Sequence, residues 1–145
     1  MRGYFAIGVE GISKAGNVGA IWRTAHAFGA SFVFTIDANY ARGEGEKTDT
    51  SAATEHVPLH EFATLEDFRL PRDCQLVGVE LTPDAIELPS FQHPRQAAYV
   101  LGPERGSLSP ALVARCDYVV RIPTAFCVNV GIAAALYHTL NHAVF

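Results

Sequence analysis

Short apolar runs alternate along this chain with segments of helical or loop-like pattern, and this alternation constrains the fold more than any other feature. Each run has about the length of one strand and is rich in β-branched, aromatic or small apolar residues. The runs cover residues 4–9, 31–36, 76–81, 97–101 and 118–122. Strands separated by crossover segments predict an α/β domain with a parallel sheet, because parallel neighbours cannot be joined by a tight hairpin.

Three other segments are predicted helices. Asn17 is a good N-cap for a helix that runs to about Phe28, and Gly29 is the expected stop signal. Ser109, which is followed by proline, predicts the start of a second helix. A third is expected from about Val128 and is apolar nearly all round, so the core or a second subunit must cover it.

Length and composition fit one compact domain. The 145 residues are 49% hydrophobic and 18% charged, which is enough to bury a core and unlike a disordered chain. No apolar run is long enough to span a bilayer and no cleavable signal segment is evident, so we expect a cytoplasmic protein. The cysteines, Cys74, Cys116 and Cys127, and the six histidines show no metal-ligand spacing. We therefore expect neither a metal nor a disulfide framework.

The net charge of −4 argues against a protein that coats nucleic acid nonspecifically. A local basic face is still compatible with it, because phosphate binding depends on where Lys and Arg lie. Lys14, Arg23 and Arg42 all fall in the first third of the chain. Residues 38–54 are the least hydrophobic stretch and are predicted to be a loop, which fits a binding loop and a solvated connector equally well.

Three segments carry groups suited to chemistry. The first, residues 14–25 (KAGNVGAIWRTA), places Asn17 near the start of a helix and Arg23 six residues later, where its planar head suits phosphate or carboxylate. The second, residues 100–109 (VLGPERGSLS), follows a strand and contains Gly102, Glu104 and Gly106. Such a loop at the carboxyl end of a parallel strand is the expected ligand site.

The third segment, residues 121–135 (RIPTAFCVNVGIAAA), leads from a strand to Asn129 at the start of the last predicted helix. Its small residues favour tight packing in the core or at a dimer contact. Each segment also has a plain structural explanation: a helix cap with a surface charge, a glycine-rich turn, and close packing. Neither the phosphate-loop pattern nor the dinucleotide glycine fingerprint is present.

In this order, the three segments resemble the SpoU/TrmH class of SPOUT methyltransferases over essentially the whole chain. The stretch NVGAIWRTAHAFGA, residues 17–30, is especially similar to the first motif of that class. The resemblance implies an α/β fold whose parallel sheet is flanked by helices and whose C-terminal segment forms a trefoil knot. It also implies a homodimer, with residues 1–145 as a single catalytic domain that has no RNA-binding extension.

The resemblance further implies S-adenosylmethionine as cofactor and S-adenosylhomocysteine as product, with the cofactor held in a bent shape mainly by backbone groups of the knotted loops. The cofactor-binding residues it implies are Val79, Glu80, Leu81, Leu101, Gly102, Pro103, Ile122, Cys127 and Val128.

The implied reaction is methyl transfer to a ribose 2′-hydroxyl of a structured RNA. Transfer RNA is favoured over ribosomal RNA as the substrate. The implied catalytic residues are Arg23, Asn17, Glu104 and Asn129, and the implied substrate-binding residues are Lys14, Arg23, Arg42 and Arg105. The family's arginine is a proposed base. Because a guanidinium rarely loses a proton, we expect Arg23 to fix the adjacent phosphate and stabilise a developing alkoxide.

The third segment departs from the family pattern. Cys127 stands where the family has Ser, and the stretch from Pro123 to Cys127 is shorter than in typical members that act on the wobble nucleotide. This departure motivates an alternative, a knotted RNA-binding or assembly factor without catalysis. A flavodoxin-like or dinucleotide-binding domain is a third alternative, which the missing glycine fingerprint disfavours.

Overall fold

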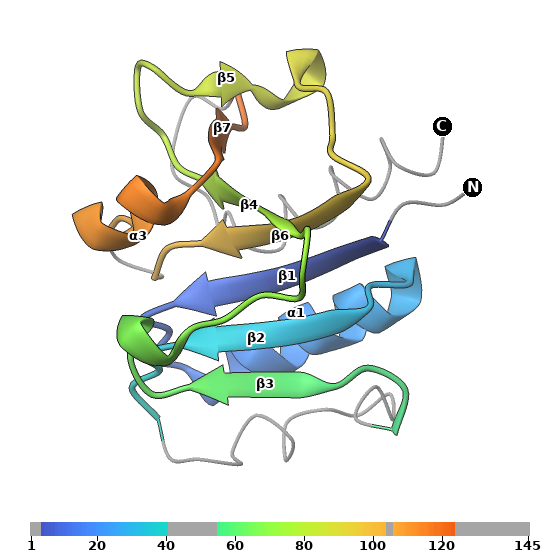
Figure 1. The fold of residues 1–145 in the computed structure, drawn as a ribbon. Helices are drawn as coiled ribbons and strands as arrows, with labels where there is room; N and C mark the ends of the chain where they lie inside the picture. Colours follow the sequence, from blue (N-terminus) through green and yellow to red (C-terminus); the bar gives the residue numbers. More distant parts are fainter. Residues whose placement is uncertain (1–3, 41–54, 104–105, 124–145) are drawn as a thin grey trace.

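A computed structural model describes residues 4–40, 55–103 and 106–123. These residues form a parallel sheet of seven strands in the order β3-β2-β1-β6-β4-β7-β5 (Figure 1). The elements in chain order are β1 (Tyr4–Glu10), α1 (Ala15–Phe28), β2 (Phe32–Ile36), β3 (Leu59–Phe62), the 3-10 turn η2 (Leu65–Asp67), β4 (Gln75–Val79), β5 (Ile86–Glu87), the 3-10 turn η3 (Leu88–Ser90), β6 (Gln96–Leu101), α3 (Pro110–Arg115) and β7 (Tyr118–Arg121). The predicted α/β class and parallel sheet are confirmed.

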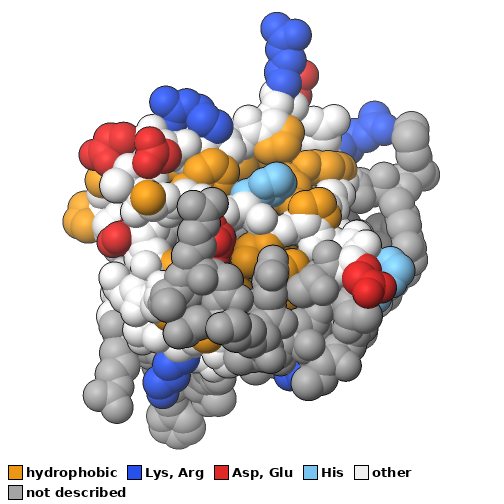
Figure 2. Space-filling view, turned by 90° about the horizontal axis from the view of Figure 1, so that it is seen from below, with side chains coloured by type: hydrophobic (Ala, Val, Ile, Leu, Met, Phe, Trp, Pro, Cys, Tyr) orange, Lys and Arg blue, Asp and Glu red, His pale blue; other side chains and the backbone are white. Residues whose placement is uncertain are grey.

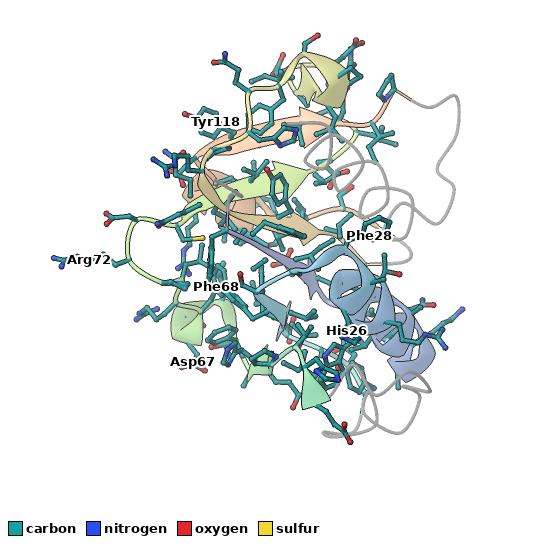
Figure 3. The ribbon with its side chains drawn as sticks, turned by 90° about the vertical axis from the view of Figure 1, so that its right-hand side faces the viewer. His26, Phe28, Asp67, Phe68, Arg72 and Tyr118 are labelled. Atoms are coloured by element: carbon teal, nitrogen blue, oxygen red, sulfur yellow. The ribbon has the colours of Figure 1, made fainter. Side chains whose placement is uncertain are left out.

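Two apolar layers cover the two faces of the sheet. On one face α1 lies nearest to β2, and its Val18, Ile21 and Trp22 belong to an apolar layer with buried side chains of β2, β1, β6 and β4. On the other face, Phe68 from the segment after η2 and Leu112 from α3 cover β2, β6 and β4. Figure 3 shows this arrangement, with the end of α1 (His26, Phe28) on one side of the sheet and Asp67, Phe68 and Arg72 on the other. Both faces of the sheet are therefore buried, as is usual for parallel strands.

The structure confirms the predicted C-terminal end of α1 and corrects the predicted start. Gly29 ends the helix with a left-handed backbone (φ 79°), and its N–H donates to the carbonyl of His26. The prediction that Asn17 caps the helix is wrong, because α1 begins at Ala15 and Lys14 occupies the cap position without a side-chain cap hydrogen bond. Alanine is the strongest helix former, so the helix extends back past the residue that resembles a cap. Asn17 lies in the first turn.

The strand predictions needed smaller corrections. The strand predicted over residues 76–81 is β4, which ends at Val79 and leaves Glu80 and Leu81 in the loop that follows. The edge strands β3 and β5 were missed, because β3 mixes His and Glu with apolar residues and β5 has two residues. Both edge strands are too short for a period-two pattern to be read from them. Ser109 caps α3 as predicted, accepting a hydrogen bond from the Leu112 amide.

The predicted knot and the helix predicted from about Val128 lie outside the described residues, as do residues 41–54 of the loop predicted over 38–54. Residues 38–40, which are described, belong to no helix or strand. Within residues 4–40, 55–103 and 106–123, no helix has the length and apolar character needed to cross a membrane.

Candidate active site at the carboxyl edge of the sheet

Four neighbouring strands end together at one edge of the sheet. In the register of the sheet, Val9 of β1 and Val79 of β4 both lie opposite Leu101 of β6, and Val79 also lies opposite Val120 of β7. The loops that follow β1, β6, β4 and β7 therefore leave the sheet side by side (Figure 1). In open parallel sheets this edge is where ligands bind.

The loop after β6, which the structure describes for residues 102–103 and 106–109, is attached to β1. Glu10, the last residue of β1, accepts a hydrogen bond from the Ser109 amide at 2.7 Å and one from the Ser109 hydroxyl at 2.6 Å. Glu10 is only 8% exposed, so both carboxylate oxygens are committed to this loop in a largely dry environment. This contact joins residues 99 positions apart in the sequence.

The same loop is attached to the end of β4. Glu80 accepts a hydrogen bond from the Leu108 amide through Oε2 at 2.7 Å and one from the Leu81 amide through Oε1 at 2.9 Å. The Glu80 amide in turn donates to the Val120 carbonyl of β7 at 2.9 Å. One glutamate thus connects the loops after β4 and β6 and lies next to the end of β7.

Two glycines allow the loops to approach closely. A Cβ atom at Gly102 would lie 3.0 Å from the Leu108 amide nitrogen, so the loop folds back on itself only because no side chain is present there. Gly11, directly after β1, has φ 71°, and a Cβ atom there would lie 3.6 Å from Pro103. The second segment, residues 100–109, therefore meets the end of β1, from which the chain leads into the first segment, residues 14–25.

Arg23 occupies a different position. It lies on the exposed side of α1, eight residues after Ala15, which is about 12 Å along the helix axis at 1.5 Å per residue. The helix starts at the carboxyl edge and runs toward the opposite edge of the sheet (Figure 1). Asn17 and Lys14, by contrast, lie at the start of α1, which follows the carboxyl end of β1.

The structure places all seven of the sequence-predicted cofactor residues that it describes at the carboxyl edge. Those at the carboxyl edge are Val79, Glu80, Leu81, Leu101, Gly102, Pro103 and Ile122. Val79, Leu101 and Ile122 are buried, whereas Leu81 is 44% exposed and offers apolar surface. The remaining predicted residues, Arg42, Glu104, Arg105, Cys127, Val128 and Asn129, lie outside the described part of the chain.

Two residues of this edge were not predicted from the sequence in these roles: Glu10 as an acceptor, and Ser109 as the donor that attaches the loop after β6 to β1. The available signal was an acidic residue at the end of an otherwise apolar strand, where burial of a charge demands a partner. The partner of Glu10 could not be predicted from the sequence, because Ser109 lies 99 positions away in the second segment, residues 100–109. Within the described residues, His, Cys, Asp and Glu side chains form no group of three or more that could hold a metal ion.

The two cysteines that the structure describes are not activated. Burial raises the pKa of Cys74 and that of Cys116 to about 11, with a further contribution from the nearby charge of Asp117 in each case. The Cys116 thiol donates to the Leu112 carbonyl at 3.3 Å and packs beneath Gly78. Neither thiol has the lowered pKa of a nucleophile.

The side of the molecule at β3 carries described side chains of several kinds. Figure 2 shows apolar side chains around a histidine there, with Lys, Arg, Asp and Glu side chains scattered among them. Within the described residues of this view, positive charge does not gather as it does on a typical phosphate-binding face.

Residues 4–138 match the model of the SpoU rRNA Methylase family, so the chain belongs to that family. This confirms the resemblance to the SpoU/TrmH class that the three signature segments indicated. No curated protein sequence matches the chain.

Solved structures share the fold. The AdoMet-bound rRNA methyltransferase of Sinorhizobium meliloti has 24% identity and a TM-score of 0.81, over 99% of this chain and 56% of that one. The SpoU methyltransferase AviRb of Streptomyces viridochromogenes, in complex with AdoMet, has 20% identity and a TM-score of 0.83, over 99% and 59%. This chain thus spans a little over half the length of these proteins.

A third structure, solved to explain 2-OH methylation of C/U34 on tRNA, has 18% identity and a TM-score of 0.79. Here the match covers 98% of this chain and 97% of the other, so the two chains have nearly the same extent.

Proposed function

We propose that this protein is an S-adenosylmethionine-dependent methyltransferase that methylates the ribose 2′-hydroxyl of a structured RNA. The observation that carries the proposal is the convergence of the second segment, residues 100–109, with the end of β1 at the carboxyl edge, through the hydrogen bonds of Glu10 with Ser109 and the close approach of Gly11 to Pro103. Family membership and the fold shared with AdoMet-bound methyltransferases support it.

The carboxyl edge fits the cofactor. Exposed Leu81 offers apolar surface for an adenine ring, and half-buried Gly102, which packs against the backbone of Ser107 and Leu108, lies at the same edge without a side chain of its own. We propose that residues 79–81, 101–104 and 122–128 hold the cofactor, with backbone groups making most of the polar contacts. When bound, S-adenosylmethionine supplies an electrophilic methyl carbon with a good leaving group.

The chain's own contribution is mainly to position the ribose. Arg23 would bind the phosphate next to the attacking hydroxyl and stabilise negative charge as its proton leaves. Asn17 and Glu104 would orient Arg23 and the loops, and Asn129 would hold the third segment. Lys14, Arg42 and Arg105 would contact the RNA backbone. The neighbour whose structure explains methylation of C/U34 on tRNA matches along its whole length, which favours transfer RNA as the substrate.

The position of Arg23 supports a homodimer. Its backbone is about 12 Å along α1 from the loop edge, farther than an arginine side chain spans, and it is on the exposed side of the helix. We propose that Arg23 faces the cofactor loops of a second copy. We also propose that residues after Pro123 complete the trefoil knot of the family.

Replacement of Arg23 tests the catalytic assignment. Arg23→Ala should lower methyl transfer from S-adenosylmethionine to tRNA by a factor on the order of 10²–10³, because a group that stabilises developing charge is lost. Cofactor affinity should change little. The measurements are transfer of a radiolabelled methyl group, mapping of the ribonuclease-resistant 2′-O-methylated nucleotide, and calorimetry with S-adenosylmethionine.

The matched control is Arg72→Ala, which removes an exposed arginine on the other side of the sheet (Figure 3) and should leave activity unchanged. Full activity of Arg23→Ala would refute the role of Arg23. If the unaltered protein bound no S-adenosylmethionine, the result would favour the alternative of a non-catalytic RNA-binding factor, which Cys127 and the short stretch before it motivate.

A further inference from the structure

Glu10 is a carboxylate that the proposed reaction does not use, yet it is buried at the edge where the loops converge. The position ends a strand whose other residues are almost all buried and apolar, and a valine or isoleucine would continue that pattern. Burial of a charge costs free energy unless hydrogen bonds satisfy it. Here both oxygens are satisfied by one residue, Ser109, through its amide and its hydroxyl.

Glu80 makes a matching contact from the other side. The loop after β6 emerges between β1 and β4, because β6 lies between these two strands in the sheet. Glu10 ends β1 and Glu80 follows β4, and they bind adjacent amides, those of Ser109 and Leu108. We call these two side chains the carboxylate clamp.

The clamp determines where the start of the loop lies. The Leu108 amide held by Glu80 is the same group that a Cβ atom at Gly102 would approach to 3.0 Å. Gly102 and Pro103 thus pack against a strand end on one side and against the clamped residues on the other. Loss of the clamp would free Leu108 to move and would remove the surface that keeps Gly102 in place.

We propose that Glu10 and Glu80 are positioning residues, whose carboxylates shape the loop after β6 for the cofactor without contacting it, so that residue 80 contributes to cofactor binding only through its backbone. The cofactor part of this inference rests on the proposed function. A purely structural role for Glu10 would be to support the cap of α3, but Ser109 makes that cap through its hydroxyl oxygen toward the Leu112 amide. The hydrogen bonds that Glu10 and Glu80 accept from the 108 and 109 amides, by contrast, connect the backbone of the loop to the flanking strands.

Amide hydrogen exchange, followed by NMR on the full protein without cofactor, tests the clamp directly. In Glu80→Ala the Leu108 amide should exchange at least tenfold faster, and in Glu10→Ala the Ser109 amide should do the same, because each loses a charged acceptor. The control Glu55→Gln alters an exposed glutamate that precedes β3 at the opposite edge of the sheet, and it should leave both amides unchanged.

Calorimetry with S-adenosylmethionine and steady-state kinetics test the consequence. Both alanine variants should bind the cofactor at least tenfold more weakly, and KM for S-adenosylmethionine should rise. At saturating cofactor, kcat should stay within about threefold of the unaltered protein, since transition-state groups are untouched. Glu10→Gln and Glu80→Gln each keep one acceptor oxygen and should recover part of the affinity.

Ser109→Ala provides a second route if Glu10→Ala does not fold. It removes the hydroxyl contact, keeps the amide contact, and should weaken cofactor binding by a smaller factor. Unchanged exchange at Leu108 and Ser109, or unchanged cofactor affinity, in folded variants would overturn the inference. If the unaltered protein binds no S-adenosylmethionine, the proposed function and the cofactor part of the inference fail together, and hydrogen exchange alone decides whether the clamp exists.

Discussion

The face of the sheet beneath α1 and the loops at its carboxyl edge are held in place by different forces. Beneath α1, Val18, Ile21 and Trp22 are at most 4% exposed, and the indole N–H of Trp22 donates to the Val57 carbonyl at 2.7 Å. At the edge, the polar contacts are charge-assisted hydrogen bonds that the carboxylates of Glu10 and Glu80 accept from loop amides. Apolar packing is non-directional, whereas these bonds define atom positions.

This difference separates stability from binding geometry. Apolar burial under α1 contributes roughly in proportion to area, so it stabilises the whole domain. The two carboxylates add less to stability but determine the shape of the loop that we propose binds the cofactor. Substitutions in the two regions should therefore affect different measurements.

The largest effect should come from Trp22→Ala. It removes a fully buried indole and leaves the Val57 carbonyl without its donor, so the free energy of unfolding should fall by about 3–5 kcal/mol. Urea denaturation followed by circular dichroism measures this. Ala27→Ser, on the exposed side of the same helix, should change stability by less than about 0.5 kcal/mol. Equal stability of the two variants would contradict the assigned core.

Gly102→Ala should reduce stability less than Trp22→Ala does, and its main effect should be on cofactor binding. The added Cβ atom would lie 3.0 Å from the Leu108 nitrogen, so the loop must shift at a cost of about 1–3 kcal/mol. Affinity for S-adenosylmethionine should fall at least tenfold. The matched control is Gly16→Ala in α1, where no atom lies within 4 Å of the added group, and which should stabilise the protein by up to about 1 kcal/mol. If Gly102→Ala bound S-adenosylmethionine with unchanged affinity, the loop after β6 would not be part of the cofactor-binding site.

The smallest effect concerns the buried thiols. With a pKa of about 11, Cys74 and Cys116 should react with iodoacetamide at pH 8 about one hundredth as fast as an accessible thiol with a pKa near 9. The neutral thiol is favoured in the folded state, so its contribution to stability is full below pH 9 and is lost as pH rises toward 11. Mass spectrometry of labelled peptides measures each rate, and labelling as fast as free cysteine would contradict the burial of these side chains.

Local features of the amino-acid sequence were sufficient to predict much of the fold. Gly29 ends α1 because a left-handed residue is easiest for glycine, and Ser109-Pro110 starts α3 because Ser caps and Pro suits the first turn. The apolar runs at β1, β2, β4 and β6 became strands because nearly all of their side chains are buried, whereas β7 has one buried residue, Val120. The start of α1 was misplaced because helix propensity at Ala15 outweighed the capping preference of Asn17.

The sequence alone determined the family, the parallel α/β class and the segments that form the candidate site, because motifs and periodicity are local. Only the tertiary structure decided the strand order and the partners at the carboxyl edge. Glu10 and Ser109 are 99 positions apart, and they meet because β6 lies between β1 and β4. No pattern within one segment reports such a contact, since it depends on the register of strands that are distant in the chain.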